Sequence, residues 1–263
     1  MRSDEPIPKP EVIASVPPNQ TGRGRNGRGT ILFFSALGMV LLVFTAWGLI
    51  FQPEPLSVVQ QAKLLLRAYK TDKLDGEWKT LLARPEMYYV PSMNIPLVGQ
   101  PAPDFRLNNW QGKSVQLERL IEEGPVVLIF YYGYWCDHCV VQLFDVDEDL
   151  KYFKELGARV VAVSSDPPAE TAAKFKQFGP FHFEVLSDPD NEVAEKYGCF
   201  QPPQGKEPEK LLHGTFLIDR KGIIRWADIG DKPFRSNKTL LLELAALEGK
   251  LPDGISLPPK SKE

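Results

Sequence analysis

The fold is decided by the stretch Pro125-Val-Val-Leu-Ile-Phe-Tyr-Tyr-Gly-Tyr-Trp-Cys136-Asp-His-Cys139-Val-Val-Gln142. Residues 126–131 form a short apolar run rich in β-branched and aromatic side chains, which predicts a fully buried strand. Beyond this run the apolar residues recur every three or four positions, which predicts a helix with one apolar face: Leu143, Val146, Leu150 and Phe153. Cys136 and Cys139 are therefore expected where a buried strand leads into the first turn of a helix.

The position of the two cysteines favours reversible thiol–disulfide chemistry. The free backbone N–H groups and the positive end of the helix dipole favour a thiolate over a thiol. We expect Cys136, at the helix start, to be the attacking thiolate and Cys139, one turn deeper, to be the resolving thiol. Two other interpretations of Cys-x-x-Cys stay open at this point, half of a zinc site and a pair of inert buried thiols.

The composition excludes several classes of protein. The chain has 263 residues and a net charge of −3, from 31 basic and 34 acidic residues, so we expect no nucleic-acid partner. Its three cysteines are too few for a disulfide-stapled scaffold and suit a catalytic role better. No cofactor is expected.

The first 51 residues predict a membrane anchor. Residues 1–29 are rich in Pro, Gly, Asn and Arg and read as a disordered basic tail. Residues 30–51 are predicted to be a transmembrane helix, because 31–51 carries no charge and is long enough, at about 1.5 Å per residue, to cross about 30 Å of hydrocarbon. Arginines before the span place the N-terminus in the cytoplasm and the rest outside it, as a single-pass protein. A signal peptide cleaved near Ala46-Trp-Gly48 is the alternative.

The remaining chain is divided by composition and periodicity. Residues 52–93 are predicted to be a helical spacer, serving either as a membrane-proximal arm or dimer contact or as a packing extension of the domain. Residues 94–250 are predicted to be the globular domain, and 251–263 a disordered tail. Within the domain, strands alternate with helices, which predicts an α/β fold with a mixed central sheet. Its expected elements are a hairpin at 105–117, strands at 158–164 and 183–186, helices at 169–178 and 191–197, a loop at 199–212, a hairpin at 215–227 and a helix after Ser236.

Ordered motifs over residues 97–249 carry a family resemblance. They are Gly99-Gln-Pro-Ala-Pro-Asp-Phe105, Gly112-Lys-Ser-Val-Gln-Leu117, Trp135-Cys136-x-x-Cys139, Gly157-Ala-Arg-Val-Val-Ala-Val-Ser164, Leu186-Ser-Asp188, Lys196-Tyr-Gly198, Gly214-Thr-Phe-Leu-Ile-Asp219 and Gly222-Ile-Ile-Arg225. In these motifs the chain resembles the thioredoxin-fold redoxins, in particular the AhpC/TSA (peroxiredoxin-like) family. The resemblance implies a thioredoxin-like fold with an N-terminal hairpin extension and an antioxidant or thiol–disulfide oxidoreductase activity.

The chain departs from that family at signature positions. A typical peroxiredoxin has a Pro-x-x-x-Thr-x-x-Cys loop. Its peroxidatic cysteine falls on Cys139, its threonine on Cys136 and its proline on Tyr132, so the proline and threonine are missing. The later arginine of peroxiredoxins and the cis-proline of thioredoxin-like reductases both fall on His213, which the resemblance places beside the dithiol.

Three further residues flank the cysteines. Trp135 is expected either to shield the site or simply to pack. His138 stands where strongly oxidising Cys-x-His-Cys turns have histidine, and in its protonated form it would stabilise the Cys136 thiolate. Asp137 opposes that effect as a neighbouring carboxylate, although it can also pair with His138 and keep it charged.

Two further predictions concern the third cysteine and the acidic residues of the helix. Cys199 is a possible additional thiol, or else a small buried hydrophobic residue. The acidic residues after the dithiol are expected to form the solvated face of the helix: Asp145, Asp147, Glu148 and Asp149.

Three functions are therefore weighed. The leading one is a membrane-anchored thiol–disulfide oxidoreductase that acts on a protein dithiol or disulfide partner. The second is a peroxiredoxin-like peroxidase, with peroxide as substrate. The third is a copper or zinc carrier that uses Cys136, Cys139 and either His213 or His138.

Overall fold

The computed structural model describes residues 56–69 and 74–258. The predicted basic tail, the predicted anchor at 30–51 and the last five residues lie outside these ranges. Within them, no helix combines the length and the apolar character needed to cross a membrane.

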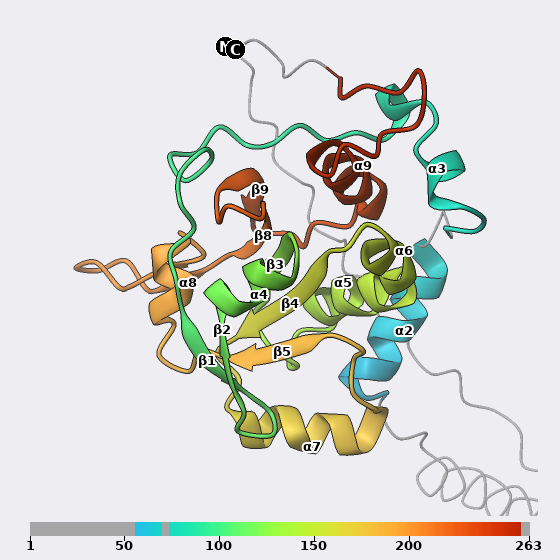
Figure 1. Ribbon diagram of the computed structural model, residues 1–263. Coiled ribbons are helices and arrows are strands. Elements are labelled where there is room, and N and C mark those ends of the chain that lie inside the picture. The colour runs from blue at the N-terminus through green and yellow to red at the C-terminus, as the bar shows by residue number, and fades with distance from the viewer. Residues whose placement is uncertain (1–55, 70–73, 259–263) are drawn as a thin grey trace, which may run out of the picture. The chain divides into compact units, whose positions relative to one another are not determined.

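The described strands form one seven-stranded sheet and a separate two-stranded one (Figure 1). The order of the large sheet is β2-β1-β5-β4-β3-β8-β9. Its strands are β1 (Arg106–Asn109), β2 (Ser114–Gln116), β3 (Val126–Phe130), β4 (Arg159–Ser164), β5 (Glu184–Ser187), β8 (His213–Ile218) and β9 (Ile224–Gly230). Strands β3, β4 and β5 run parallel, and β8, β9, β1 and β2 join by antiparallel pairing. The mixed sheet predicted from the sequence is confirmed.

Helices cover both faces of the sheet. One face packs against α5 (Asp137–Glu148), α6 (Leu150–Glu155), α7 (Pro168–Phe178) and α9 (Asn237–Leu247). α2 (Val58–Tyr69) packs against α5 on the same side. The other face packs against α4 (Leu117–Glu123) and α8 (Glu192–Lys196). The remaining described elements are α3 (Trp78–Leu81), the 3-10 turn η1 (Pro85–Met87), β6 (Phe200–Gln201) and β7 (Lys210–Leu211).

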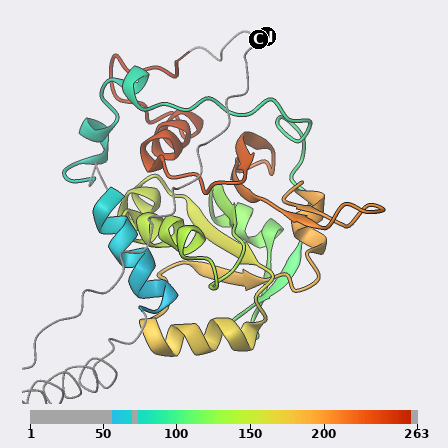
Figure 2. The ribbon, with the colours of Figure 1, turned by 180° about the vertical axis from the view of Figure 1, so that it is seen from behind.

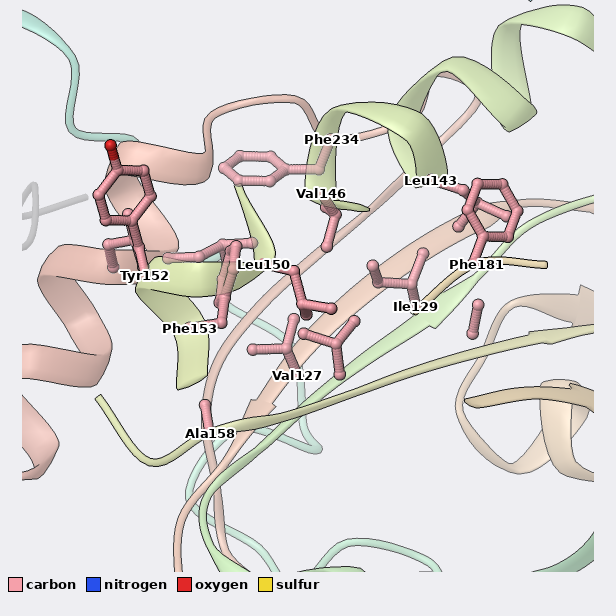
Figure 3. Packing of buried hydrophobic residues seen from close by; sticks show 14 of the residues in the cluster. Val127, Ile129, Leu143, Val146, Leu150, Tyr152, Phe153, Ala158, Phe181 and Phe234 are labelled. Atoms are coloured by element: carbon pink, nitrogen blue, oxygen red, sulfur yellow. The ribbon is translucent and has the colours of Figure 1, made fainter. Parts of the chain in front are cut away.

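Strand β3 is the centre of the core. All five of its residues are buried, and they alternate between the two faces of the sheet. Val127 and Ile129 point toward Leu143 and Val146 of α5 (Figure 3). Burial of each such aliphatic side chain stabilises the fold by about 1.5–3 kcal/mol, so β3 and α5 are held firmly against each other.

The active-site helix is broken where the sequence predicted continuity. α5 ends at Glu148, Asp149 caps both helices, and α6 begins at Leu150. Asp145 and Asp149 are buried rather than solvated, which corrects the predicted acidic face. The reason is Asn237 at the start of α9, whose Nδ2 donates to the Asp145 carbonyl at 3.1 Å and to Asp149 Oδ2 at 2.8 Å.

The described part of 52–93 packs onto the domain. α2 lies beside α5 in both views (Figures 1 and 2), and Val59 and Ala62 are buried in the shared core. Further along, the Tyr89 hydroxyl donates to Glu243 Oε1 at 2.6 Å, and Trp226 Nε1 donates to the Val90 carbonyl at 3.0 Å. These contacts favour the packing alternative for this segment.

Two local predictions were wrong. The segment 199–212, expected to be a loop, contains the short antiparallel pair β6–β7. Leu117, expected to end the first hairpin, instead begins α4. Both elements are too short to produce a clear periodicity in the sequence.

Gly214 in β8 allows a close approach that a larger residue would block. A Cβ at this position would overlap Cys199 Sγ and meet the Phe216 ring at 2.8 Å. Gly230 in β9, which pairs with His213, has no atom within 4 Å of such a Cβ, and neither glycine has a positive φ. We expect Gly214→Ala to lower the free energy of unfolding by about 1–3 kcal/mol through overpacking.

The measurement is urea unfolding of the full chain, with Gly230→Ala as the matched control, which we expect within about 0.5 kcal/mol of wild type. Equal stability of the two variants would contradict the packing described around Gly214.

Candidate active site

The two cysteines lie at the junction of β3 and α5. Cys136 is the N-cap of α5, with an extended backbone (φ −107°, ψ 108°), and its Sγ accepts a hydrogen bond from the Cys139 N–H at 3.4 Å. The two residues form a disulfide, with 5.4 Å between their Cα atoms. The predicted placement at a strand-to-helix junction is confirmed.

The two cysteines differ in burial. Cys136 is partly exposed, whereas Cys139 is 0% exposed. A molecule in solution therefore reaches Cys136 first. The backbone N–H that points at its sulfur, at a helix N-terminus, stabilises negative charge there. The roles of attacking and resolving thiol remain predictions.

His213, on the sheet, contacts the cysteine pair. It is the first residue of β8, it is 3% exposed, and its Nε2 lies 3.0 Å from Cys139 Sγ. Burial lowers the pKa of His213 to about 4, and backbone groups of Asp231 and Gly230 only partly oppose this shift. At neutral pH the imidazole is therefore uncharged, and one ring nitrogen holds a lone pair.

A buried polar contact fixes the spacing between α5 and β8 behind the dithiol. Gln142 Nε2 donates to Thr215 Oγ1 at 2.9 Å, and both side chains are 1% exposed. Gln142 is one turn beyond Cys139, and Thr215 is two residues beyond His213 on the same strand. This pair was not predicted from the sequence. The available signal was a polar residue at one position of an otherwise apolar helix face.

The turn before Cys136 is fixed by a hydrogen bond to a residue that follows β4. Asp166 follows β4 and is buried, and its Oδ2 accepts the Tyr134 N–H at 2.8 Å. Burial raises the pKa of Asp166, and the Tyr134 N–H opposes that shift. Gly133 has φ +138°, and a Cβ there would lie 2.6 Å from Asp166 Oδ1. This contact was not predicted from the sequence, because it joins residues that only the tertiary structure brings together.

An aromatic surface borders the site. Trp135 is 61% exposed and stacks on Tyr132, with 6.0 Å between ring centroids. Tyr132 in turn lies 4.1 Å from the His213 ring. Trp135 is therefore not packed into the core, and with Tyr132 it offers an apolar face beside Cys136.

The other candidate residues lie differently. His138 is exposed on the first turn of α5, and the side chain of Asp137 lies outside what the structure describes. Cys199 belongs to the core on the opposite face of the sheet from Cys139. Burial raises its thiol pKa far above the usual range, so it stays protonated. The structure does not bring Cys199 together with the dithiol.

Comparison with known proteins shows the family of the chain. Residues 98–227 match the model of the AhpC/TSA family. The chain is also 32% identical over 129 residues to the putative peroxiredoxin bcp of Helicobacter pylori (strain ATCC 700392 / 26695). This match covers 48% of this chain and 84% of that protein. The chain belongs to the AhpC/TSA family.

Other known proteins match parts of the chain. Over 69 residues it is 29% identical to the thiol-disulfide oxidoreductase ResA of Bacillus thuringiensis (strain Al Hakam), so the match spans 26% of this chain and only 39% of that relative. The reduced 2-Cys peroxiredoxin of Plasmodium vivax superposes with a TM-score of 0.52 at 22% identity, over 59% of this chain and 83% of that one. At that identity the likeness establishes the thioredoxin-like fold alone. Members of the family are oxidoreductases.

Burial of His213 predicts a pH-dependent stability. Its pKa is about 4 in the folded chain and about 6.5 when unfolded, so the unfolded state binds more protons as the pH falls through this window. Stability is therefore complete above pH 6.5 and falls toward pH 4, by up to about 3 kcal/mol.

The test is urea unfolding of the oxidised chain at several pH values, compared with His213→Gln, which lacks the titrating group. We expect the wild-type curve to fall more steeply than that of the variant between pH 6.5 and 4. Parallel curves would mean that His213 is not buried as a neutral ring.

Proposed function

We propose that the protein is a thiol–disulfide oxidoreductase that exchanges disulfides with protein partners through Cys136 and Cys139. The observation that carries the proposal is the asymmetry of the pair: a partly exposed sulfur at a helix N-terminus is bonded to a fully buried one. The partial likeness to ResA, a thiol–disulfide oxidoreductase by name, supports the same chemistry.

The exchange proceeds in two displacements. In the reduced protein, the Cys136 thiolate attacks one sulfur of a partner disulfide, the partner's S–S bond breaks, and one partner thiolate leaves. The Cys139 thiol then loses its proton and attacks Cys136 Sγ, which closes the disulfide and releases the second partner thiolate. The partner gains two electrons and, after protonation, two protons. The reverse sequence oxidises a partner dithiol.

His213 is assigned to the second displacement. Its Nε2 lies 3.0 Å from Cys139 Sγ in a site from which water is largely excluded. A neutral imidazole at that distance is within reach to accept the Cys139 proton as the thiol attacks. Gln142 and Thr215 act as positioning residues, because their hydrogen bond sets the spacing of α5 and β8.

Trp135 and Tyr132 suit a protein partner. Their stacked rings form an exposed apolar face directly before Cys136. Aromatic side chains at the edge of a site contribute much contact area at a low entropic cost. We infer that a peptide segment flanking the partner's disulfide or dithiol lies on this face.

The proposed location is the outer side of a membrane. The uncharged run at 31–51, preceded by arginines at 23–28, supports a single-pass anchor with a cytoplasmic N-terminus. The redoxin domain would then be extracytoplasmic, where protein disulfides form and persist.

A peroxidase is the second candidate, favoured by the match to a putative peroxiredoxin. In this chain, however, the residue aligned with the peroxidatic cysteine is Cys139, which is completely buried. The loop threonine and proline that activate peroxide in that family are replaced by Cys136 and Tyr132. Disulfide exchange through Cys136 therefore fits the site better.

Trapping of a mixed disulfide tests the proposal. The full chain carrying Cys139→Ser keeps the accessible sulfur but cannot resolve, so with glutathione disulfide it should accumulate a covalent adduct on Cys136, seen by mass spectrometry. Cys136→Ser leaves only the buried sulfur of the pair and should react at least about tenfold more slowly, because a thiol removed from the helix start and from solvent is less ionised and less accessible.

Cys199→Ser is the matched control and should leave the wild-type reaction unchanged, since Cys199 lies on the other face of the sheet. Faster adduct formation in Cys136→Ser than in Cys139→Ser would contradict the assignment of the two sulfurs.

A further inference from the structure

Three side chains that commonly bind metals converge at the active site. Cys136 Sγ, Cys139 Sγ and His213 Nε2 all lie within 4.8 Å of one another. They come from two elements that are fixed against each other, the start of α5 and the start of β8. In the disulfide exchange proposed above His213 only accepts a proton, so binding a metal through Nε2 would be a second role for the same side chain.

His213 is oriented as a ligand would be. The side chain is 97% removed from solvent, and Nε2 is directed at the sulfur of Cys139. The other ring nitrogen, Nδ1, is buried and forms no well-aligned hydrogen bond within the part of the chain that the structure describes. Nε2 is therefore held toward the sulfurs by packing against Tyr132 and by the position of β8.

The donor set selects the kind of metal. Two thiolates and one imidazole are soft or borderline donors, which suit Cu(I) without a further ligand, whereas Zn²⁺ held by the same set takes a water as its fourth ligand. Among the described residues, this group supplies three ligand atoms. Two thiolates, a neutral imidazole and Cu(I) also leave a single net negative charge, next to the N–H groups that begin α5.

We propose that the reduced protein binds one Cu(I) ion through Cys136 Sγ, Cys139 Sγ and His213 Nε2. Binding displaces the remaining thiol protons and forms two Cu–S bonds and one Cu–N bond, with no change in the oxidation state of copper. The disulfide cannot bind in this way, because its sulfurs carry no negative charge and are bonded to each other. Copper binding and the disulfide therefore exclude each other.

This exclusion has a functional consequence. Cu(I) would hold the dithiol reduced by mass action and would block attack by Cys136 while it stays bound. Conversely, oxidation of the pair would release the ion. The partly exposed Cys136 is the side from which the ion can enter, since Cys139 and His213 are both buried.

The test uses the full-length chain reduced with a phosphine under anaerobic conditions. Cu(I) is titrated into it against a chromophoric Cu(I) chelator, and the metal site is examined by X-ray absorption. We expect one Cu(I) per chain with two sulfur neighbours and one nitrogen neighbour, and no retained copper in the disulfide form. This comparison of two redox states needs no substitution, so it does not depend on a variant that folds.

Variants then assign the ligands. Cys136→Ser and Cys139→Ser should each lose affinity by more than tenfold, and His213→Gln by at least about tenfold with loss of the nitrogen neighbour, since even outer-shell changes commonly cost that much. Cys199→Ser and His182→Ala are matched controls, because Cys199 lies on the other face and His182 is paired with Asp147 at 3.0 Å. Both should bind as wild type does.

Several results would overturn the proposal. Failure of the reduced chain to retain Cu(I) would do so, as would equal retention by the oxidised chain. Unchanged affinity and unchanged absorption in His213→Gln would remove the third ligand. Tighter binding of Zn²⁺ than of Cu(I) under the same conditions would overturn the choice of metal. None of these outcomes bears on mixed-disulfide trapping, which tests the disulfide exchange separately.

Discussion

The whole site depends on the burial of one strand, β3, between β4 and β8. The end of β3 delivers the chain into the turn that starts α5, which sets the position of Cys136 and Cys139. The same strand pairs with β8 in a register that sets Phe130 opposite Gly214, so His213 lies next to the dithiol. Because β3 contributes side chains to both cores, a shift of its register would displace both halves of the site at once.

The two cysteines differ in exposure, and this difference suits them to different steps of the exchange. Cys136 combines access to solvent with the N-terminus of a helix, while Cys139 lies beneath it in contact with a neutral histidine. One sulfur is thus suited to meet a partner and the other to complete the exchange. Cys199 has neither feature: burial keeps it protonated and β8 separates it from the pair.

The sequence predicted most of the fold, and the reasons for its failures are physical. Strand β3, the hairpins and α9 have strong periodicities or caps, such as Ser236, whose Oγ accepts the Thr239 N–H. Asp145 and Asp149 were misassigned because their burial depends on Asn237, far along the chain. Helical periodicity describes one helix and carries no information about what packs on its polar side.

In the candidate site, too, some features were predicted from the sequence and others were missed. The cysteine pair was found from local spacing, and His213 only through a family resemblance, since no local pattern marks a lone histidine before a strand. The Gln142–Thr215 and Asp166–Tyr134 contacts were missed, because each joins residues that the sheet topology brings together. Contacts of this kind follow from tertiary structure, so a single sequence does not reveal them.

The central claim is that the dithiol exchanges with disulfides rather than reducing peroxides. The most direct test is stopped-flow oxidation of the reduced full chain, followed by tryptophan fluorescence, with hydrogen peroxide in one series and a protein disulfide in the other. We expect hydrogen peroxide to oxidise the dithiol no faster than it oxidises an ordinary thiol, and the protein disulfide to oxidise it much faster. A peroxide rate orders of magnitude above that of an ordinary thiol would rule out this assignment.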